Sequence, residues 1–312
     1  MTGTVLQLGS REVWRALDVI DPVATMAEFL IDRTVGRAGH DSRSRGRLIS
    51  WSDTASNGTG LVLLDHPDVT GTCVLPAETL RSSQAVVLAA VAAREMLVSG
   101  GVTMAVIGPP ADTEPQLSVL ARHVPDISHV AVCSDRPDLD EVGAETAEQL
   151  EKSGIGLSVV STVADAVFGA NLVVTTDHSR FAKGLAGLRI GNLARGALLV
   201  NASGTDLPAE LVDHVDEVYV DDLGLVDHHP DRHVVATSLA ARAAGTATGR
   251  LGIEPRIAGD LVQLLTGRHA DRRRSGDIVL MELLGGHELN ADLAYRIYEV
   301  AAHTSLGVRI AN

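Results

Sequence analysis

The fold is decided by the stretch 102–113, VTMAVIGPPADT, in which an apolar strand is followed at once by a glycine and the start of a helix. The same pattern continues after it, because short apolar strands alternate with amphipathic intervals. Short apolar strands separated by helices are typical of a parallel sheet covered on both faces, so we predict a doubly wound α/β domain. The predicted strands are 102–107, 130–133, 157–160, 172–175, 197–200, 218–220 and 277–283, and the predicted helical intervals are 116–123, 139–153, 163–169 and 208–213.

The residues before this domain have a different pattern. Apolar side chains at helical spacing predict one helix over 11–36. A second, long helix is predicted over 76–98, and its middle, AVVLAAVAA (85–93), is apolar on every side, which indicates burial. Between these two helices, residue types alternate over 42–51, which is typical of a strand. The pair Asn57-Gly58, a strong signal for a hairpin turn, follows this segment, and a return strand is predicted over 60–65. A closing helix is predicted over 290–305.

Composition excludes several classes of protein. The 312 residues include 40 acidic and 26 basic side chains, giving a net charge of −14, and Lys152 and Lys183 are the only lysines. Without a basic block, we expect no nucleic-acid or membrane partner. Cys73 and Cys133 form neither a disulfide framework nor a zinc pattern. The N-terminus lacks the features of an export signal, and no apolar run reaches the ~20 residues of a membrane span, so we expect a soluble, cytoplasmic protein.

The turn after the first parallel strand is the usual place for a dinucleotide. Gly108 occupies the first position of a GxGxxG/A turn, but Pro110 stands where the second glycine belongs and lacks an N–H group. Asp112 and Glu114 place negative charge near the expected phosphates, and the alternative is that these acids cap the helix that follows. The turn has the right position and an atypical sequence.

The end of the second parallel strand carries Asp135, which is suited to ribose hydroxyls, and Arg136, which is suited to the 2′-phosphate of NADP. An Asp-Arg pair at a strand end is also common on protein surfaces. We predict that either NAD or NADP binds here. The predicted cofactor-binding residues are Gly108, Ala111, Asp112, Thr113, Asp135, Arg136, Thr175 and Thr176.

Arginines are the candidate substrate-binding residues. Arg43, Arg45 and Arg47 recur at every second position, so in a strand they would share one face and could clamp a carboxylate. The alternative is an edge strand protected by charge. Arg81 begins the buried helix, where its alternative role is an ion pair with Glu78 one turn away.

Asp206 is the candidate acid–base residue. It follows the predicted strand 197–200, near the carboxyl ends of the strands, where α/β proteins bind ligands. The alternative is that Asp206 or Thr205 caps the helix that begins near Pro208. The histidine-rich segment 227–233 lacks a helical metal-binding spacing and reads as an exposed loop, so we predict no metal site.

Taken in order, several of these segments resemble the ornithine cyclodeaminase/mu-crystallin family. The resemblance implies a Rossmann-like NAD(P)-binding domain, residues 98–287, inserted in a smaller α+β domain for substrate binding and dimerisation, residues 1–97 and 288–312. The matching stretches are VIDPVATMAEFLIDRTVG (19–36), TG (70–71), LRSSQAVVLAAVAA (80–93), AVFGANLVVTT (166–176), GALLVNASGTDLPAEL (196–211), EVYVDD (217–222) and DLAYRIYEVAAHTSLGV (292–308).

The resemblance also implies the chemistry. Arg81 matches the arginine that holds the substrate carboxylate, and Arg45 or Arg47 matches that of the early substrate-binding strand. Asp206 matches the acid/base group beside the substrate nitrogen. The family moves a hydride between a nicotinamide and the Cα of an amino or imino acid. We therefore expect an imine reductase, amino-acid dehydrogenase or cyclodeaminase that forms a homodimer.

The sequence departs from the family pattern in several places. The family lysine after the early arginine has no counterpart, since residues 1–151 contain no lysine, and a segment there is replaced by the turn 53–60. The lysine of the Asp206 motif is also missing, and Pro109-Pro110 alters the glycine-rich turn. The alternative is therefore a homologue without hydride chemistry, serving as a ligand- or partner-binding protein or as an enzyme independent of nicotinamide.

Overall fold

The computed structural model describes residues 4–38, 47–52, 61–65, 72–108, 110–133, 142–176, 185, 187–243, 257–268 and 275–311. The chain divides into two compact units. One is formed by Met1–Val87 with Gly285–Asn312, and the other by Leu88–Leu284. The boundary at residue 87 falls inside the long helix α3 (Ala77–Met96).

The unit that contains both chain ends has a five-stranded mixed sheet with the order β13-β1-β4-β3-β2. β1 pairs in parallel with β4 and antiparallel with β13, while β2, β3 and β4 are antiparallel neighbours. Helix α10 packs against α1, α2 and β3. The bounds are Thr4–Gln7 (β1), Arg47–Ser52 (β2), Leu61–Asp65 (β3), Thr72–Pro76 (β4), Val308–Ala311 (β13), Ser10–Val19 (α1), Pro22–Ala38 (α2) and His287–Thr304 (α10).

The single helix expected over residues 11–36 is wrong, because the structure has two helices there. α1 ends at Val19, and Ile20 has an extended backbone. α2 begins at Pro22, and the Oδ1 atom of Asp21 accepts a hydrogen bond from the N–H of Ala24 at 2.9 Å. A proline lacks the N–H that a continuous helix needs and is favourable at a helix start, so Pro22 divides a segment whose apolar spacing looks continuous.

The second unit is built on an eight-stranded sheet with the order β11-β10-β12-β9-β8-β5-β6-β7, in which every pairing is parallel. This confirms the predicted doubly wound α/β fold. The strands are Val102–Ile107 (β5), Ile127–Cys133 (β6), Gly156–Val160 (β7), Leu172–Thr175 (β8), Leu198–Asn201 (β9), Glu217–Val220 (β10), Ile257–Asp260 (β11) and Val279–Glu282 (β12).

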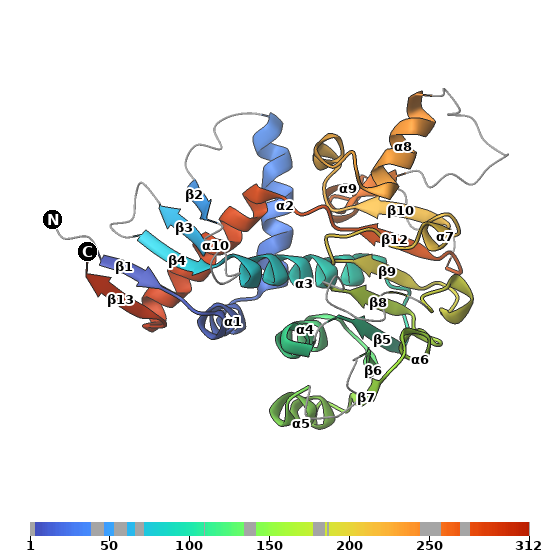
Figure 1. Cartoon of the computed structure of the whole chain (residues 1–312), viewed down its shortest axis with the longest axis horizontal. Coiled ribbons are helices and arrows are strands. Elements are labelled where there is room, and N and C mark those ends of the chain that lie inside the picture. Colours follow the sequence, from blue (N-terminus) through green and yellow to red (C-terminus); the bar gives the residue numbers. More distant parts are fainter. Residues whose placement is uncertain are drawn as a thin grey trace. The chain divides into compact units, whose positions relative to one another are not determined.

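Helices cover both faces of the parallel sheet, with α4 and α5 on one face and α6 and α7 on the other (Figure 1). α6 and α7 enclose a core of Val, Leu, Ile and Ala side chains that includes Ile107, Val173 and Leu199. No described helix is long and apolar enough to cross a membrane. The helices are Pro110–His123 (α4), Ala144–Lys152 (α5), Val163–Val167 (α6), Ala209–Val212 (α7), His233–Ala243 (α8) and Leu261–Leu265 (α9), with the 3-10 turns Ile190–Asn192 (η3) and Leu223–His228 (η4).

The strand order gives the sheet a topological switch point. From β5 the chain proceeds outward through β6 to β7 and then returns to β8, on the other side of β5. In open parallel sheets the crevice beyond the carboxyl ends at such a point is the usual ligand site. β12 lies between β9 and β10, so a strand from the last part of the chain places its carboxyl end beside that of β9.

Candidate active site at the carboxyl ends of the parallel strands

Polar residues end three neighbouring strands of the parallel sheet. Thr175 ends β8, Asn201 ends β9 and Glu282 ends β12, and the strand register pairs Thr175 with Asn201 and Asn201 with Glu282. Their exposed fractions are 0%, 0% and 1%. Buried polar groups in proteins have hydrogen-bond partners, and this edge of an α/β sheet is where ligands bind. The row therefore marks a candidate site.

Asn201 is the centre of this row. Its Nδ2 donates to both carboxylate oxygens of Glu282 at 3.0 Å and to the backbone oxygen of Thr205 at 2.8 Å. Its Oδ1 accepts from the hydroxyls of Thr175 at 2.9 Å and Ser203 at 2.6 Å. Because both ends of the amide are engaged, Asn201 fixes the carboxylate of Glu282 relative to the loop after β9.

Arg232, just before α8, joins Glu282 to the predicted acid–base residue. Its Nη2 donates to Glu282 Oε1 and, at 2.9 Å, to the backbone oxygen of Thr205, and its Nε donates to Asp206 Oδ1 at 3.1 Å. The side chain of Arg232 is 13% exposed and that of Asp206 is 45% exposed. One guanidinium thus links a buried carboxylate to one that solvent can reach.

Asp206 is held by a helix as well as by Arg232. Its Oδ1 accepts a hydrogen bond from the N–H of His233, the first residue of α8, at 3.0 Å. The alternative in which Asp206 caps the helix near Pro208 is wrong, because α7 has no side-chain cap there and Asp206 caps α8 instead. No donor in the described part of the chain reaches the second oxygen, Oδ2. The hydrogen bonds that hold Asp206 in the described part of the chain are therefore made through Oδ1.

The environment of Glu282 changes its acidity. The pKa of Glu282 is raised to about 7, mainly by burial and to a smaller extent by the carboxylates of Asp206 and Asp221, while the Arg232 charge and the Asn201 hydrogen bond oppose the increase. Asp221 follows β10, is fully buried and accepts a hydrogen bond from the N–H of Leu284 at 2.9 Å. Two carboxylates, Glu282 and Asp206, thus share the guanidinium of Arg232, and Glu282 changes charge near neutral pH.

Three of the residues predicted from sequence to bind a cofactor, Gly108, Thr175 and Thr176, lie together at the switch point, at the carboxyl ends of β5 and β8. The N–H of Thr176 donates to the backbone oxygen of Ile107 at 2.8 Å, and Ile107 is paired with Thr175. A Cβ atom on Gly108 would lie 1.6 Å from Thr176 Oγ1, so any other residue at position 108 would collide with that hydroxyl. Gly108, Thr175 and Thr176 therefore lie close together, where β5 and β8 end.

The structure explains part of the atypical sequence of the turn between β5 and α4. Pro110 is the first residue of α4, a position where a helix leaves its N–H unpaired and where proline is favourable. Glu114 does not cap its own helix, because its Oε1 accepts a hydrogen bond from Thr146 Oγ1, in the first turn of α5, at 2.9 Å. Thr113 is fully buried on α4. The side chains of Ala111 and Asp112, and the residues Pro109, Asp135 and Arg136, lie outside the described part of the chain.

The model of the ornithine cyclodeaminase/mu-crystallin family matches residues 57–302 of this sequence, which include both the switch point and the Asp206 network. The chain belongs to this family. Comparison with curated proteins finds no match of significant similarity.

Solved structures that cover nearly the whole chain share its fold. A Thermococcus litoralis Δ1-pyrroline-2-carboxylate reductase in complex with NADH and L-proline matches with a TM-score of 0.70 and 14% identity, covering 98% of this chain and 100% of that one. An archaeal alanine dehydrogenase dimer with bound NAD gives 0.67 and 17%, covering 98% and 99%. The iminosuccinate reductase of Paracoccus denitrificans in complex with NAD⁺ gives 0.64 and 15%, covering 99% of each chain.

The substrate-binding arginines predicted from the family resemblance belong to the unit Met1–Val87. Arg81 is exposed on α3. Arg47 begins β2, but its side chain is outside the described part, as are Arg45 and the turn Asn57-Gly58. Asp206 belongs to the other unit.

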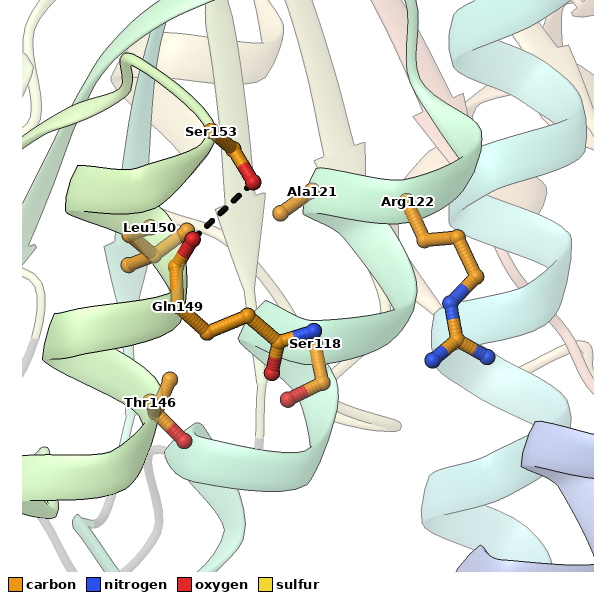
Figure 2. A pocket seen from close by; sticks show the side chains of 7 residues that line it. All are labelled: Ser118, Ala121, Arg122, Thr146, Gln149, Leu150 and Ser153. Atoms are coloured by element: carbon orange, nitrogen blue, oxygen red, sulfur yellow. Dashed lines mark hydrogen bonds between the residues drawn. The ribbon is translucent and has the colours of Figure 1, made fainter.

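A surface groove of about 130 Å³ lies between α4 and α5. Gln149 of α5 reaches toward Ser118 of α4 across it, and the hydroxyl of Ser153 donates to the backbone oxygen of Gln149 at 2.9 Å (Figure 2). Among the residues that the structure describes, no Asp, Glu, His or Cys side chain lines the groove. Its hydroxyl groups therefore have no carboxylate or imidazole beside them to act as a general base, unlike the polar groups at the strand ends.

Two histidines of the segment 227–233 differ in their surroundings. The Nδ1 atom of His228 lies 3.2 Å from the backbone oxygen of Gly224, whereas the buried Nε2 atom of His233 has no hydrogen-bond partner in the described part of the chain and lies 3.7 Å from Asp213 Oδ1. Among the described residues, no group of three or more His, Cys, Asp or Glu side chains is placed to hold a metal ion. His233 contributes its backbone N–H to Asp206.

Sequence reasoning missed three members of the Asp206 network. Asn201 and Glu282 are the last residues of apolar strands, so the rule about carboxyl ends that selected Asp206 would also have found them. Arg232 lies in a histidine-rich segment and has no such signal, because its partners come from distant parts of the chain.

We predict that Glu282→Gln removes a pH-dependent part of the stability. The pKa of Glu282 rises from an ordinary value of 4.5 to about 7 on folding, so the proton is bound more tightly in the folded state. The stability that this tighter proton binding contributes is fully present below pH 4.5 and is lost as the pH rises through about 7. From about pH 4 to pH 8, the free energy of unfolding of the wild type should fall by about 3 kcal/mol relative to the variant. Urea unfolding at several pH values measures this difference.

Thr175→Val is the control, because it removes a hydrogen bond from the same buried network without removing an ionisable group. Its loss of stability, about 1 kcal/mol, should stay nearly constant across the same pH range. A difference between wild type and Glu282→Gln that is equally constant would contradict the prediction.

Proposed function

We propose that the protein is an NAD(P)-dependent oxidoreductase for a small amino or imino acid, with Asp206 as its acid–base residue. The observation that carries the proposal is the fixed carboxylate of Asp206. It is held by Arg232 and by the first N–H of α8, in the loop after β9, on the edge that also holds Gly108, Thr175 and Thr176. Family membership supports the same class of reaction.

The geometry of Asp206 suits proton transfer at a substrate nitrogen. Oδ1 accepts two hydrogen bonds and is fixed, and we assign Oδ2 to the substrate. Reduction of an imine adds a hydride at carbon and a proton at nitrogen, and oxidation of an amine removes both. The bound nicotinamide supplies or accepts the hydride, and we assign the proton to Asp206 Oδ2.

The β5–α4 turn is compatible with a dinucleotide. Gly108 has no side chain at the switch point, and α4 begins two residues later, so its first N–H groups and positive dipole end belong to this edge. Pro110 removes a donor from the turn, but α4 retains the donors of the residues after it. We assign Gly108, Ala111, Asp112, Thr113, Thr175 and Thr176 to the cofactor, and Asp135 and Arg136 to its ribose end.

We assign the substrate carboxylate to Arg81 and to Arg45 or Arg47. A guanidinium can bind a carboxylate through two parallel hydrogen bonds, and the chain has no lysine before Lys152 that could replace it. This choice favours an imine reductase or amino-acid dehydrogenase over an ornithine cyclodeaminase, because the lysines of the family motifs are absent. The second candidate, a partner-binding protein without hydride chemistry, rests on the Pro109-Pro110 turn and the acidic residues Asp112 and Glu114 that follow it.

We also propose that the protein is a homodimer formed through its five-stranded sheet. One face of this sheet is covered by α10 and includes buried Leu6, Leu64 and Leu75. On the opposite face, Val308 and Ile310 are 64% and 46% exposed, and the register joins them to a face continued by Val5, Val74, Leu63 and Leu61. An apolar sheet face of this kind is typical of a subunit interface.

NADH or NADPH should stabilise the purified protein. A ligand at 100 times its Kd adds about 2.7 kcal/mol to the free energy of unfolding, which thermal unfolding detects as a higher midpoint. Gly108→Ala should weaken this shift, because its Cβ would overlap Thr176 Oγ1. Gly101→Ala, at the other end of β5, should retain the shift, since the nearest atom to its Cβ lies at 3.9 Å. No shift of the wild type at millimolar cofactor would favour the partner-binding protein.

Asp206→Asn should lower turnover by about 10²- to 10⁴-fold, the usual contribution of an acid–base group. The fold should persist, because the Asn oxygen still accepts the N–H that caps α8. The assay follows NAD(P)H absorbance with the amino or imino acid that the wild type turns over. Asp21→Asn, the same change at the exposed cap of α2, should leave turnover unchanged. Wild-type activity of Asp206→Asn would remove the assigned role.

Ile310→Asp should convert the dimer into a monomer, because it buries a charge in the proposed interface. Sedimentation equilibrium of both proteins measures the mass. Phe168→Asp is the matched control, since Phe168 is an apolar residue 78% exposed on the other unit, after α6. A wild type that sediments as a monomer would contradict the proposed assembly.

A further inference from the structure

The orientation of Asp206 depends on a guanidinium that is itself anchored elsewhere. Arg232 donates to Asp206 through Nε and to Glu282 through Nη2. Of these two carboxylates, that of Glu282 is 1% exposed and is fixed by both oxygens to Asn201. The rigid end of the bridge is therefore Glu282, on β12, and the end that solvent reaches is Asp206.

An ion pair between Arg232 and Asp206 alone would be a weak constraint. Pairs that reach solvent contribute little, because two long side chains must lose conformational freedom to form them. Here the buried pair with Glu282 and the bond to the Thr205 backbone already hold the guanidinium. Asp206 therefore meets a donor whose position is set in advance, which is the condition for accurate placement of a catalytic group.

We propose that Glu282 is a positioning residue for Asp206 that acts through Arg232, and that the bridge functions only while Glu282 is ionised. The proposal rests on the acid–base role proposed above for Asp206. Glu282 does not touch the substrate in this assignment. It holds Arg232, and Arg232 holds Asp206 Oδ1, which leaves Oδ2 in one orientation.

The charges that surround Glu282 make this bridge sensitive to pH. Arg232 faces it from the segment before α8, Asn201 from β9, Asp206 from the loop after β9 and Asp221 from the end of β10. Burial, together with the two aspartates, raises the pKa of Glu282 to about 7. When Glu282 takes up a proton, its ion pair with Arg232 becomes a weaker hydrogen bond to a neutral acceptor, and Asp206 is held less firmly. Turnover should therefore fall on the acid side of neutrality.

The test is the dependence of kcat and KM on pH for the wild type and Glu282→Gln. The wild type should show an acid limb in kcat with an apparent pKa about 7, and the variant should lack this limb. Its kcat should be about 10- to 100-fold lower, because the catalytic carboxylate is misplaced, while KM changes little. Glu282→Asp keeps the charge and should restore the limb in part.

Glu217→Gln is the matched control, since Glu217 is a buried glutamate of the same sheet, at the start rather than the end of β10. This variant should keep the wild-type pH profile even where it lowers the unfolding midpoint. Arg232→Lys provides a second route, because a lysine keeps a cation beside Glu282 but cannot bridge two carboxylates as a guanidinium does. It should show the same loss of kcat, with KM little changed.

An acid limb that persists in Glu282→Gln, or wild-type kcat in both Glu282→Gln and Arg232→Lys, would overturn the positioning role. If Asp206→Asn is inactive in the same series, the acid–base assignment survives that result. Full activity of Asp206→Asn would instead overturn the acid–base assignment, and the positioning role with it.

Discussion

Arg232 lies between two carboxylates, one at the buried end of a strand and one in a loop that solvent reaches, and the candidate site depends on this bridge. Breaking a buried ion pair by removing one partner is strongly destabilising, because the remaining charge stays in a medium of low polarity. Glu282, Arg232 and Asp206 come from β12, the segment before α8 and the loop after β9. The bridge therefore fixes three parts of the chain that are distant in sequence.

The switch point of the sheet imposes a second constraint at the same edge. Gly108 and Thr176 come within contact distance because β5 and β8 are neighbours although two strands intervene in sequence. Thr175 donates a hydrogen bond to Asn201, and Asn201 donates one to Glu282, so the side chains at the ends of β8, β9 and β12 are linked. Backbone pairing across β5, β8, β9 and β12 thus sets the spacing between the residues assigned to the cofactor and those assigned to proton transfer.

Much of the fold was accessible from the sequence, because a buried parallel sheet requires apolar strands that stand out from the intervals between them. β5 was predicted with its observed bounds, as was β8. The prediction failed where a local signal was misread or weak. Pro22 interrupts an apparently continuous helix, and the short strands β1 and β13, which meet from opposite ends of the chain, give no periodic signal of their own.

The candidate site was less accessible, since its contacts join residues that are far apart in the chain. Asp206 was selected from its place after a strand, but the helix it caps begins at His233, which sequence proximity does not indicate. Asn201 and Glu282 could have been found from the carboxyl-end rule. No pattern in the segment around Arg232 indicates that its partners are Asp206 and Glu282, because strand order, not spacing in the sequence, brings them together.

The charge of the network constrains how an amino acid would approach it. With Glu282 ionised, the two carboxylates of Glu282 and Asp206 surround the single positive charge of Arg232. The net charge of the group is therefore negative, which attracts a protonated nitrogen and repels a carboxylate. Of the two lysines, Lys152 pairs with Glu148 on the exposed face of α5. Under the proposed assignment, arginine binds the substrate carboxylate and the nitrogen faces Asp206. The local charge of this network thus favours one orientation of a zwitterion.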